Sequence, residues 1–207
     1  MSSGDPYDFD DTPPPNAIRQ WRRIVFDYPQ VLQLQRKYAN LRSVHSYDMP
    51  YLAGYSVKRD RIFFDRHMEY IQTIGNKRIN INPCIKLHEA TESALLDCWA
   101  LFRAQLHFPK EPNYEIAHHI ATAVEYQAVE ALDVKVKDYQ KCLRPQMKEA
   151  VGEKIERVPK DYDTFPIESE PHAKSDEQIL RAVHAAMERD KGSRLGFTRR
   201  ARFAGAR

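Results

Sequence analysis

Apolar side chains recur at three- and four-residue intervals near the start of the chain, and this spacing predicts amphipathic helices. The first helix is expected to begin at Asn16, a residue type suited to capping a helix N-terminus, and to bury Trp21 and Ile24. Pro29 interrupts the pattern, and a second short helix is predicted over residues 31–41. Both helices are expected to cover the core rather than to carry chemistry.

The same periodicity returns in the middle of the chain and again near its end. Helices are predicted over residues 85–102, over 113–132 with Asn113 as the cap, and over 134–143, where Pro145 kinks or ends the helix. A late helix is predicted over 175–191, because Ser175 and Gln178 stand in capping-box positions and Gly192 stops the pattern.

Strand signals are confined to two short stretches. Residues 51–66 contain two aromatic and β-branched runs around a charged turn at 58–61, which predicts a β-hairpin. A second strand is expected to start at residue 78, and Pro83 ends it or confines it to a sheet edge. The sequence therefore predicts an α+β fold, mostly helical, with a small hairpin or sheet ahead of the helices at 85–102 and 113–132.

Composition divides the chain of 207 residues into one folded body and looser ends. An acidic, proline-rich head and a basic tail without acidic residues are both expected to be disordered. The expected divisions are a head at 1–15, an α+β metal-binding domain at 16–150, an extended linker at 151–174, a helix at 175–191 and the tail at 192–207.

Charge and cysteine usage restrict the partners and the compartment. Residues 192–207 contain five arginines and no acidic residue, which is more positive charge than the net +3 of the whole chain. The rest of the chain is therefore slightly acidic and is not expected to bind nucleic acid, so only the tail is expected to contact it. No apolar run approaches the roughly 20 residues of a membrane span, and no secretory signal begins the chain, so no membrane partner is expected. Three widely spaced cysteines indicate reduced thiols in a cytoplasmic protein.

Two helical motifs carry the candidate chemistry. His88 and Glu92 are four residues apart, so they project from one face of a helix, with Glu89 about a quarter-turn away. His118 and Glu125 are seven residues apart and share a face of the next long helix. If the two helices pack together, their donor atoms converge.

This donor set predicts a zinc site. His88, Glu92 and His118 would be the metal ligands, since two histidines and one glutamate form a known catalytic zinc set with a fourth position open. Glu89 would accept the proton of a zinc-activated water. Glu125 would be a fourth ligand or would orient His118, and Tyr55 is a candidate donor to a developing oxyanion, with core packing as its alternative role.

The segment His88-Glu89-Ala90-Thr91-Glu92 resembles the His-Glu-x-x-His motif of gluzincin metallopeptidases, with Glu92 in place of the second histidine and His118 in place of the distant glutamate. The resemblance implies a zincin-like architecture and a zinc-dependent hydrolase, with peptides as substrates. The stretch of roughly residues 48–140, including 53–56 and 64–66, is also similar to a set of uncharacterised phage and prophage proteins.

The phage resemblance implies a bacterial host cytoplasm or association with a virion. It keeps open an alternative function, a phage structural, assembly or interaction protein whose metal site is structural or vestigial and whose partners are virion proteins.

A carboxylate-bridged di-iron centre is disfavoured, because on these two helices only residues 115–118 have the Glu-x-x-His form that such bundles repeat.

Overall fold

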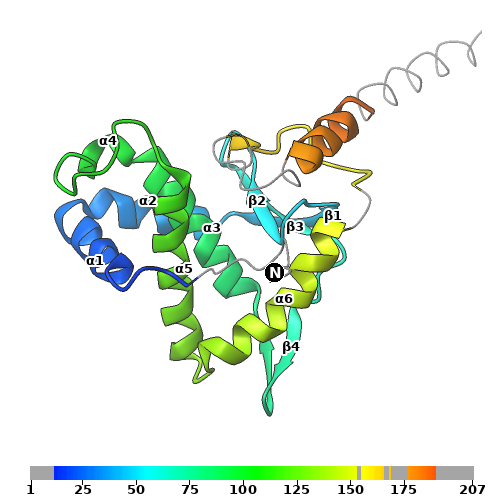
Figure 1. Ribbon diagram of the computed structural model, residues 1–207, viewed down its shortest axis with the longest axis horizontal. Coiled ribbons are helices and arrows are strands. Elements are labelled where there is room, and N and C mark those ends of the chain that lie inside the picture. Colours follow the sequence, from blue (N-terminus) through cyan, green and yellow to red (C-terminus); the bar gives the residue numbers. More distant parts are fainter. Residues whose placement is uncertain (1–11, 153–154, 166–167, 169–176, 190–207) are drawn as a thin grey trace, which may run out of the picture.

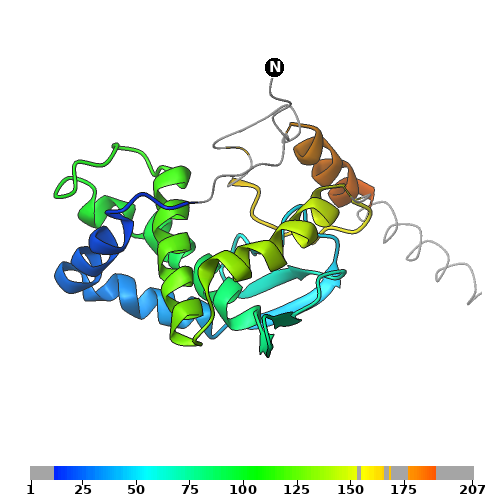
Figure 2. The same ribbon diagram turned by 60° about the horizontal axis from the view of Figure 1, so that its bottom comes forward.

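The fold is built around one central helix. The computed structural model describes residues 12–152, 155–165, 168 and 177–189. Helix α3 (Asn82–Asp97) packs against α2 (Pro29–Ala39) and α5 (Tyr114–Ala131) and, toward the sheet, against strand β2 (Ala53–Tyr55) (Figures 1 and 2). Helices predominate over two small sheets, so the predicted α+β, mostly helical class is confirmed. In the described ranges no helix has the length and apolar content needed to cross a bilayer.

The N-terminal helices follow the apolar pattern closely. Helix α1 (Ala17–Asp27) buries Trp21 and Ile24. Asn16 directly precedes α1, as predicted, but its side chain makes no capping hydrogen bond. Helix α2 begins at Pro29, earlier than expected, because proline fits the first turn of a helix, where its missing N–H is not needed.

The predicted hairpin at 51–66 is present and belongs to a larger sheet. Strands β2 and β3 (Arg61–Asp65) pair antiparallel, with Tyr55 opposite Ile62. Strand β1 (Arg42–Tyr47), which the sequence analysis missed, lies parallel to β3 on its other side, so the order is β1-β3-β2. The Asp65 carboxylate accepts hydrogen bonds from the backbone amides of Met49 and His67 and thereby holds the crossing between β1 and β2.

A second hairpin precedes α3. Strand β5 (Lys77–Asn80) matches the strand predicted to begin near residue 78, and β4 (Ile71–Ile74) is its antiparallel partner. Pro83 lies in the first turn of α3, so the helix begins three residues before the predicted Ile85. The helix predicted over 85–102 is two helices, α3 and α4 (Trp99–Phe102), separated at Cys98.

Helix α5 has nearly its predicted bounds, and the side chain of Asn113 accepts a hydrogen bond of 2.8 Å from the amide of Ile116 as its cap. The prediction that the next helix spans 134–143 was wrong. Helix α6 (Val136–Gly152) continues through Pro145, because a proline removes only one backbone hydrogen bond from a helix that is otherwise intact.

The segment predicted as a linker contributes to a second core. Ile155, Val158 and Tyr162 are buried with Phe63 of β3 and with Val183 of a helix at 177–189. This helix lies within the predicted range 175–191, whereas its expected cap Ser175, most of the head and the whole tail at 192–207 lie outside the described residues.

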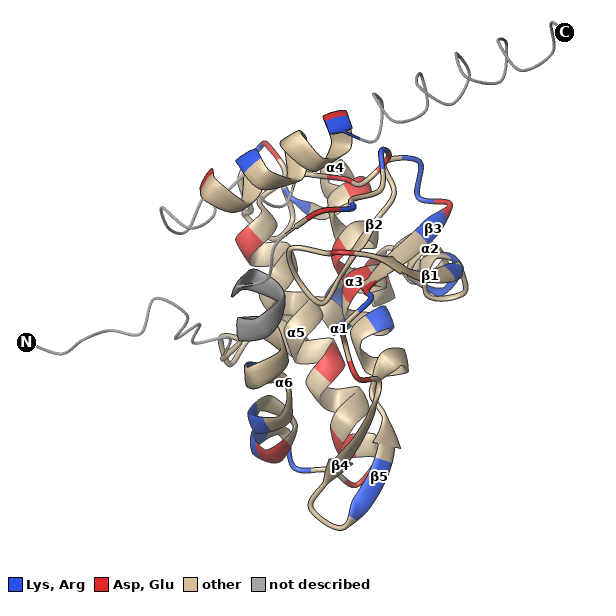
Figure 3. Ribbon diagram, turned by 90° about the vertical axis from the view of Figure 1, so that its right-hand side faces the viewer, with Lys and Arg blue, Asp and Glu red and all other residues tan. Residues whose placement is uncertain are grey.

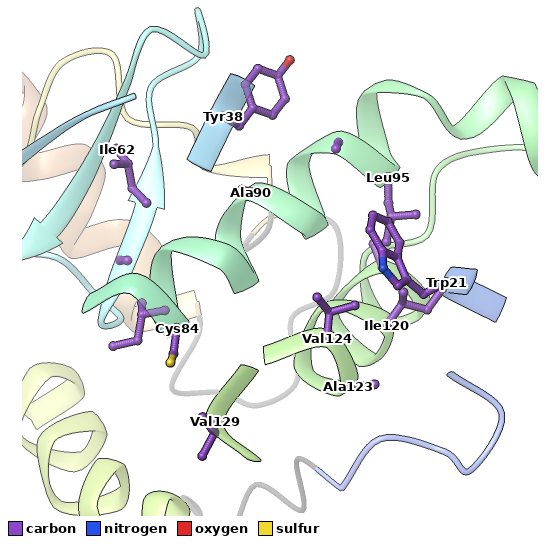
Figure 4. Close-up of a cluster of buried hydrophobic side chains, with 14 of the residues drawn as sticks. Trp21, Tyr38, Ile62, Cys84, Ala90, Leu95, Ile120, Ala123, Val124 and Val129 are labelled. Atoms are coloured by element: carbon purple, nitrogen blue, oxygen red, sulfur yellow. The ribbon is translucent and has the colours of Figure 1, made fainter. Parts of the chain in front are cut away.

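The main core occupies the space between the helices. Figure 4 shows side chains of α1, α3 and α5 meeting there, among them Trp21, Leu95 and Ile120. Leu95 and Ile120 are almost completely buried, which fixes α3 against α5 along their length. The relative placement of these two helices sets the geometry of the candidate site.

Candidate metal centre

Three side chains predicted as ligands meet between α3 and α5. Acidic positions occur on both helices (Figure 3), and one of them, Glu92, lies beside His88 and His118. His88 and Glu92 share a face of α3 one turn apart, and His118 approaches them from α5. One potential ligand atom from each residue lies within 4.8 Å of the other two, so the group could hold a metal ion.

The three atoms form a nearly equilateral triangle. Nε2 of His88 is 3.2 Å from Nδ1 of His118, which is 3.2 Å from Oε2 of Glu92. The third edge, from Nε2 of His88 to Oε2 of Glu92, measures 3.5 Å. In a tetrahedral zinc site with bonds of about 2.0–2.1 Å, ligand atoms lie about 3.3 Å apart. The triangle therefore has the size of one face of such a tetrahedron.

Burial makes the electrostatics of this group strong. His88 and Glu92 are buried, whereas the His118 side chain is 28% exposed. Burial alone would raise the pKa of Glu92, but hydrogen bonds from His118 and His88 lower it to about 2. Burial likewise opposes a charge on His88, yet Glu125 and Glu92 raise its pKa well above the ordinary value. The cluster therefore attracts a proton or another cation.

Glu125 occupies a position behind the triangle. Its Oε2 lies 3.0 Å from Nδ1 of His88, on the opposite side of the imidazole ring from Nε2. The hydroxyl of Tyr139 on α6 donates to Oε1 at 2.5 Å. Of the two roles predicted for Glu125, this geometry fits ligand orientation rather than a fourth ligand, and it orients His88, whereas the shared helical face had suggested His118.

Glu89 lies beside the cluster, and its carboxyl group is available for hydrogen bonding. It is half-buried, and no described residue forms a hydrogen bond with it. Burial raises the pKa of Glu89 to about 8, and the charge of Glu92 adds to the shift. The Glu89 side chain thus lies close enough to Glu92 for the two to interact electrostatically, and it can form a hydrogen bond with a water molecule.

Tyr55 faces the same region from β2. It is buried, and its hydroxyl has no hydrogen-bond partner among the described residues. Burial and then the charge of Glu89 raise the pKa of Tyr55, while Arg59, whose guanidinium lies 5.8 Å from the ring centroid, lowers it. The Tyr55 hydroxyl therefore remains able to donate a hydrogen bond to another group.

Two further tyrosines lie near the cluster: Tyr114, which the sequence assigns to packing, and Tyr162, which was not among the predicted residues. The ring of Tyr114 stacks on His118 with centroids 5.6 Å apart, a contact that their spacing of four residues on one helix could have indicated. Tyr162 packs across Gly54 of β2 and, like Tyr114, has its pKa raised by burial and by the charges of Glu89 and Glu92. No sequence signal places Tyr162 here, because its segment folds back from beyond α6.

In comparisons with protein-family models, with curated proteins and with solved structures, no match to this chain was found. The assignment of the site therefore rests on the geometry and chemistry of its own residues.

Proposed function

We propose that this chain is a zinc-dependent hydrolase whose substrates are peptides. The observation that carries the proposal is the triangle of His88 Nε2, His118 Nδ1 and Glu92 Oε2, with edges of 3.2, 3.2 and 3.5 Å. Two imidazoles and one carboxylate with a fourth position open are a ligand set of catalytic zinc. Magnesium and calcium prefer shells made of oxygen alone.

Charge balance supports a divalent ion. The side chains of Glu92 and Glu125 are both buried, and both contact the His88 ring. Glu92 lies 3.5 Å from Nε2, and Glu125 lies 3.0 Å from Nδ1. Buried charges are stable only when they are compensated, and one divalent cation compensates two carboxylates. The metal-free cluster must instead retain protons, in keeping with the raised pKa of His88.

The residues around the ligands have distinct roles in the proposed hydrolysis. A zinc ion held by His88, Glu92 and His118 would supply Lewis acidity and would lower the pKa of a water molecule there to about 7. Glu89 accepts a proton from the attacking water and delivers it to the leaving amine. Tyr55 donates its unpartnered hydroxyl to the carbonyl oxygen of the substrate as negative charge develops there.

The choice of peptides as substrates rests on the resemblance to gluzincins. Glu89 follows His88 directly, as the base follows the first histidine in His-Glu-x-x-His. The set of two histidines and one glutamate is kept. Glu92 stands where the motif has its second histidine, and His118 stands where the motif has its distant glutamate.

Elemental analysis of protein purified without added metal tests the metal assignment, and about one zinc per chain is expected. Glu89→Gln should retain the zinc and lower cleavage of a fluorescence-quenched peptide library at least about 100-fold. Glu130→Gln, an exposed glutamate on α5, is the matched control and should change neither quantity.

Two outcomes would overturn the proposal in different ways. Protein without zinc, whose melting temperature does not respond to a chelator, would refute the metal site. Protein that holds zinc but cleaves no peptide, and loses only stability when the zinc is removed, would make the site structural and favour the alternative of an assembly or interaction protein.

A further inference from the structure

Among its described side chains, helix α6 contributes no ligand to the triangle, yet one of them reaches the candidate centre. Tyr139 is 1% exposed, and its hydroxyl donates to Oε1 of Glu125 at 2.5 Å. The other oxygen of Glu125 lies 3.0 Å from Nδ1 of His88. An unbroken hydrogen-bond chain therefore runs from α6 through α5 to the first ligand on α3.

We propose that Tyr139 is a positioning residue of the metal centre. Through Glu125 it fixes the His88 ring with the proton on Nδ1 and the lone pair of Nε2 directed at the ion. The inference rests on the metal site of the proposed function, and it is independent of whether that site hydrolyses peptides.

The argument starts from the chemistry of imidazole. A neutral histidine carries one ring proton, and the hydrogen bond that one nitrogen makes decides which nitrogen keeps a lone pair for a metal. A carboxylate only accepts hydrogen bonds, so Glu125 Oε2 selects the form of His88 with its proton on Nδ1. This leaves Nε2 as the ligand atom, and Nε2 is the atom of His88 that belongs to the triangle.

Tyr139 in turn determines where Glu125 points. The Glu125 side chain is only 8% exposed, so water cannot replace a lost donor without cost. With one oxygen bound to Tyr139 and the other to His88, the carboxylate plane cannot rotate without breaking a bond at both ends. Loss of the Tyr139 hydroxyl frees this rotation and loosens the His88 ring.

Tyr139→Phe tests the inference by removing one hydroxyl. Zinc affinity, measured by competition with a chromophoric chelator, is expected to fall about 10- to 100-fold, the usual effect of losing an outer partner of a metal-binding histidine. Tyr38→Phe is the control, because it removes a hydrogen bond of 2.6 Å from a buried tyrosine to the Asp97 carboxylate. It should leave zinc affinity unchanged although it also removes a tyrosine–carboxylate bond.

A double-mutant comparison separates positioning from general stability. If Tyr139 acts through Glu125, Tyr139→Phe should weaken zinc binding by less than about twofold when Glu125→Gln is already present. The cobalt-substituted Tyr139→Phe protein should also show a shifted visible spectrum, which loss of packing elsewhere does not produce. Independent, multiplicative losses of affinity from the two substitutions would overturn the proposal.

Nitrogen-15 spectra of the wild-type protein provide a measurement that needs no variant to fold. In the zinc-loaded protein the His88 proton is expected on Nδ1. A proton on Nε2, or unchanged zinc affinity in Tyr139→Phe, would refute the positioning role whatever the peptide assay shows. A wild-type chain without zinc would refute it together with the metal site, and elemental analysis identifies that case by itself.

Discussion

Nε2 of His88 and Nδ1 of His118 lie 3.2 Å apart, although thirty residues separate them in the chain. Two ring nitrogens at this distance are stable when a proton or a metal ion lies between them, since two facing lone pairs repel each other. The packing of α3 against α5 thus maintains a geometry that the side chains alone would not adopt. It holds two bases and the Glu92 carboxylate ready for one cation.

Removal of His118 is expected to abolish metal binding. His118→Ala deletes one corner of the triangle and should lower the zinc content from about one ion per chain to below about 0.1, because two remaining ligands do not hold zinc tightly. His119→Ala is the matched control on the same helix, since His119 is outside the triangle, and it should keep its zinc. Equal losses in the two variants, measured by elemental analysis, would contradict the ligand assignment.

Zinc affinity should depend steeply on pH. Glu125 and Glu92 raise the pKa of His88 well above its ordinary value in the metal-free protein, so zinc competes with a tightly held proton there. Apparent affinity is therefore expected to fall about tenfold per pH unit for each displaced proton as the solution is acidified. Competition titrations at a series of pH values measure this slope, and an affinity that stays constant with pH would show that no ligand loses a proton.

Glu92 should stabilise the metal-free fold at neutral pH. Its pKa falls from the ordinary 4.5 to about 2, so its stabilising contribution is complete above about 4.5 and disappears as the pH drops through about 2. Glu92→Gln should lower the free energy of unfolding by about 3–5 kcal/mol at pH 7, since it leaves buried histidines without their counter-charge. Urea unfolding in the presence of a chelator measures both effects, and a wild-type stability that does not decrease on acidification would rule the ion cluster out as their source.

The contact between β2 and the segment at 155–165 should be sensitive to a single methyl group. A Cβ atom at Gly54 would lie 2.5 Å from Cε2 of Tyr162, whose ring is buried. Gly54→Ala is therefore expected to cost about 1–3 kcal/mol and to speed hydrogen exchange at 155–163. Adding Tyr162→Leu should recover part of the loss in thermal melting, and a Gly54→Ala protein as stable as the wild type would show that Tyr162 moves freely.

Local patterns predicted most of the helices and the hairpin. Asn113 caps α5 as its residue type indicated, and Trp21 and Ile24 are buried as their spacing required. Strand β1 could not be predicted in this way, because it is half-exposed and shows no clear alternation of buried and exposed residues. Its parallel partner is β3, and β2 lies between the two in the sequence. Pairing between distant segments leaves no periodic mark in the sequence.

The same limit applies to the site. Helical spacing grouped His88 with Glu92, and the packing of two adjacent helices added His118. The partner of Glu125 depends on how α5 is rotated against α3, which spacing within one helix does not determine. Tyr139 on α6 and Tyr162 beyond it reach the centre only through tertiary packing.

The outer edge of β2, on the side away from β3, affects how an extended peptide could approach the metal centre. Ser56 bridges to Tyr162, the amide of Val57 donates to the carbonyl of Asp161, and the amide of Asp163 donates to the carbonyl of Tyr55. The chain's own backbone thus occupies this edge at residues 55–57, so neither a second copy nor an extended peptide can pair with the sheet at that point. A peptide that pairs with β2 at this point would first have to displace residues 161–163, whereas the His118 side chain, which is 28% exposed, is accessible without such a change.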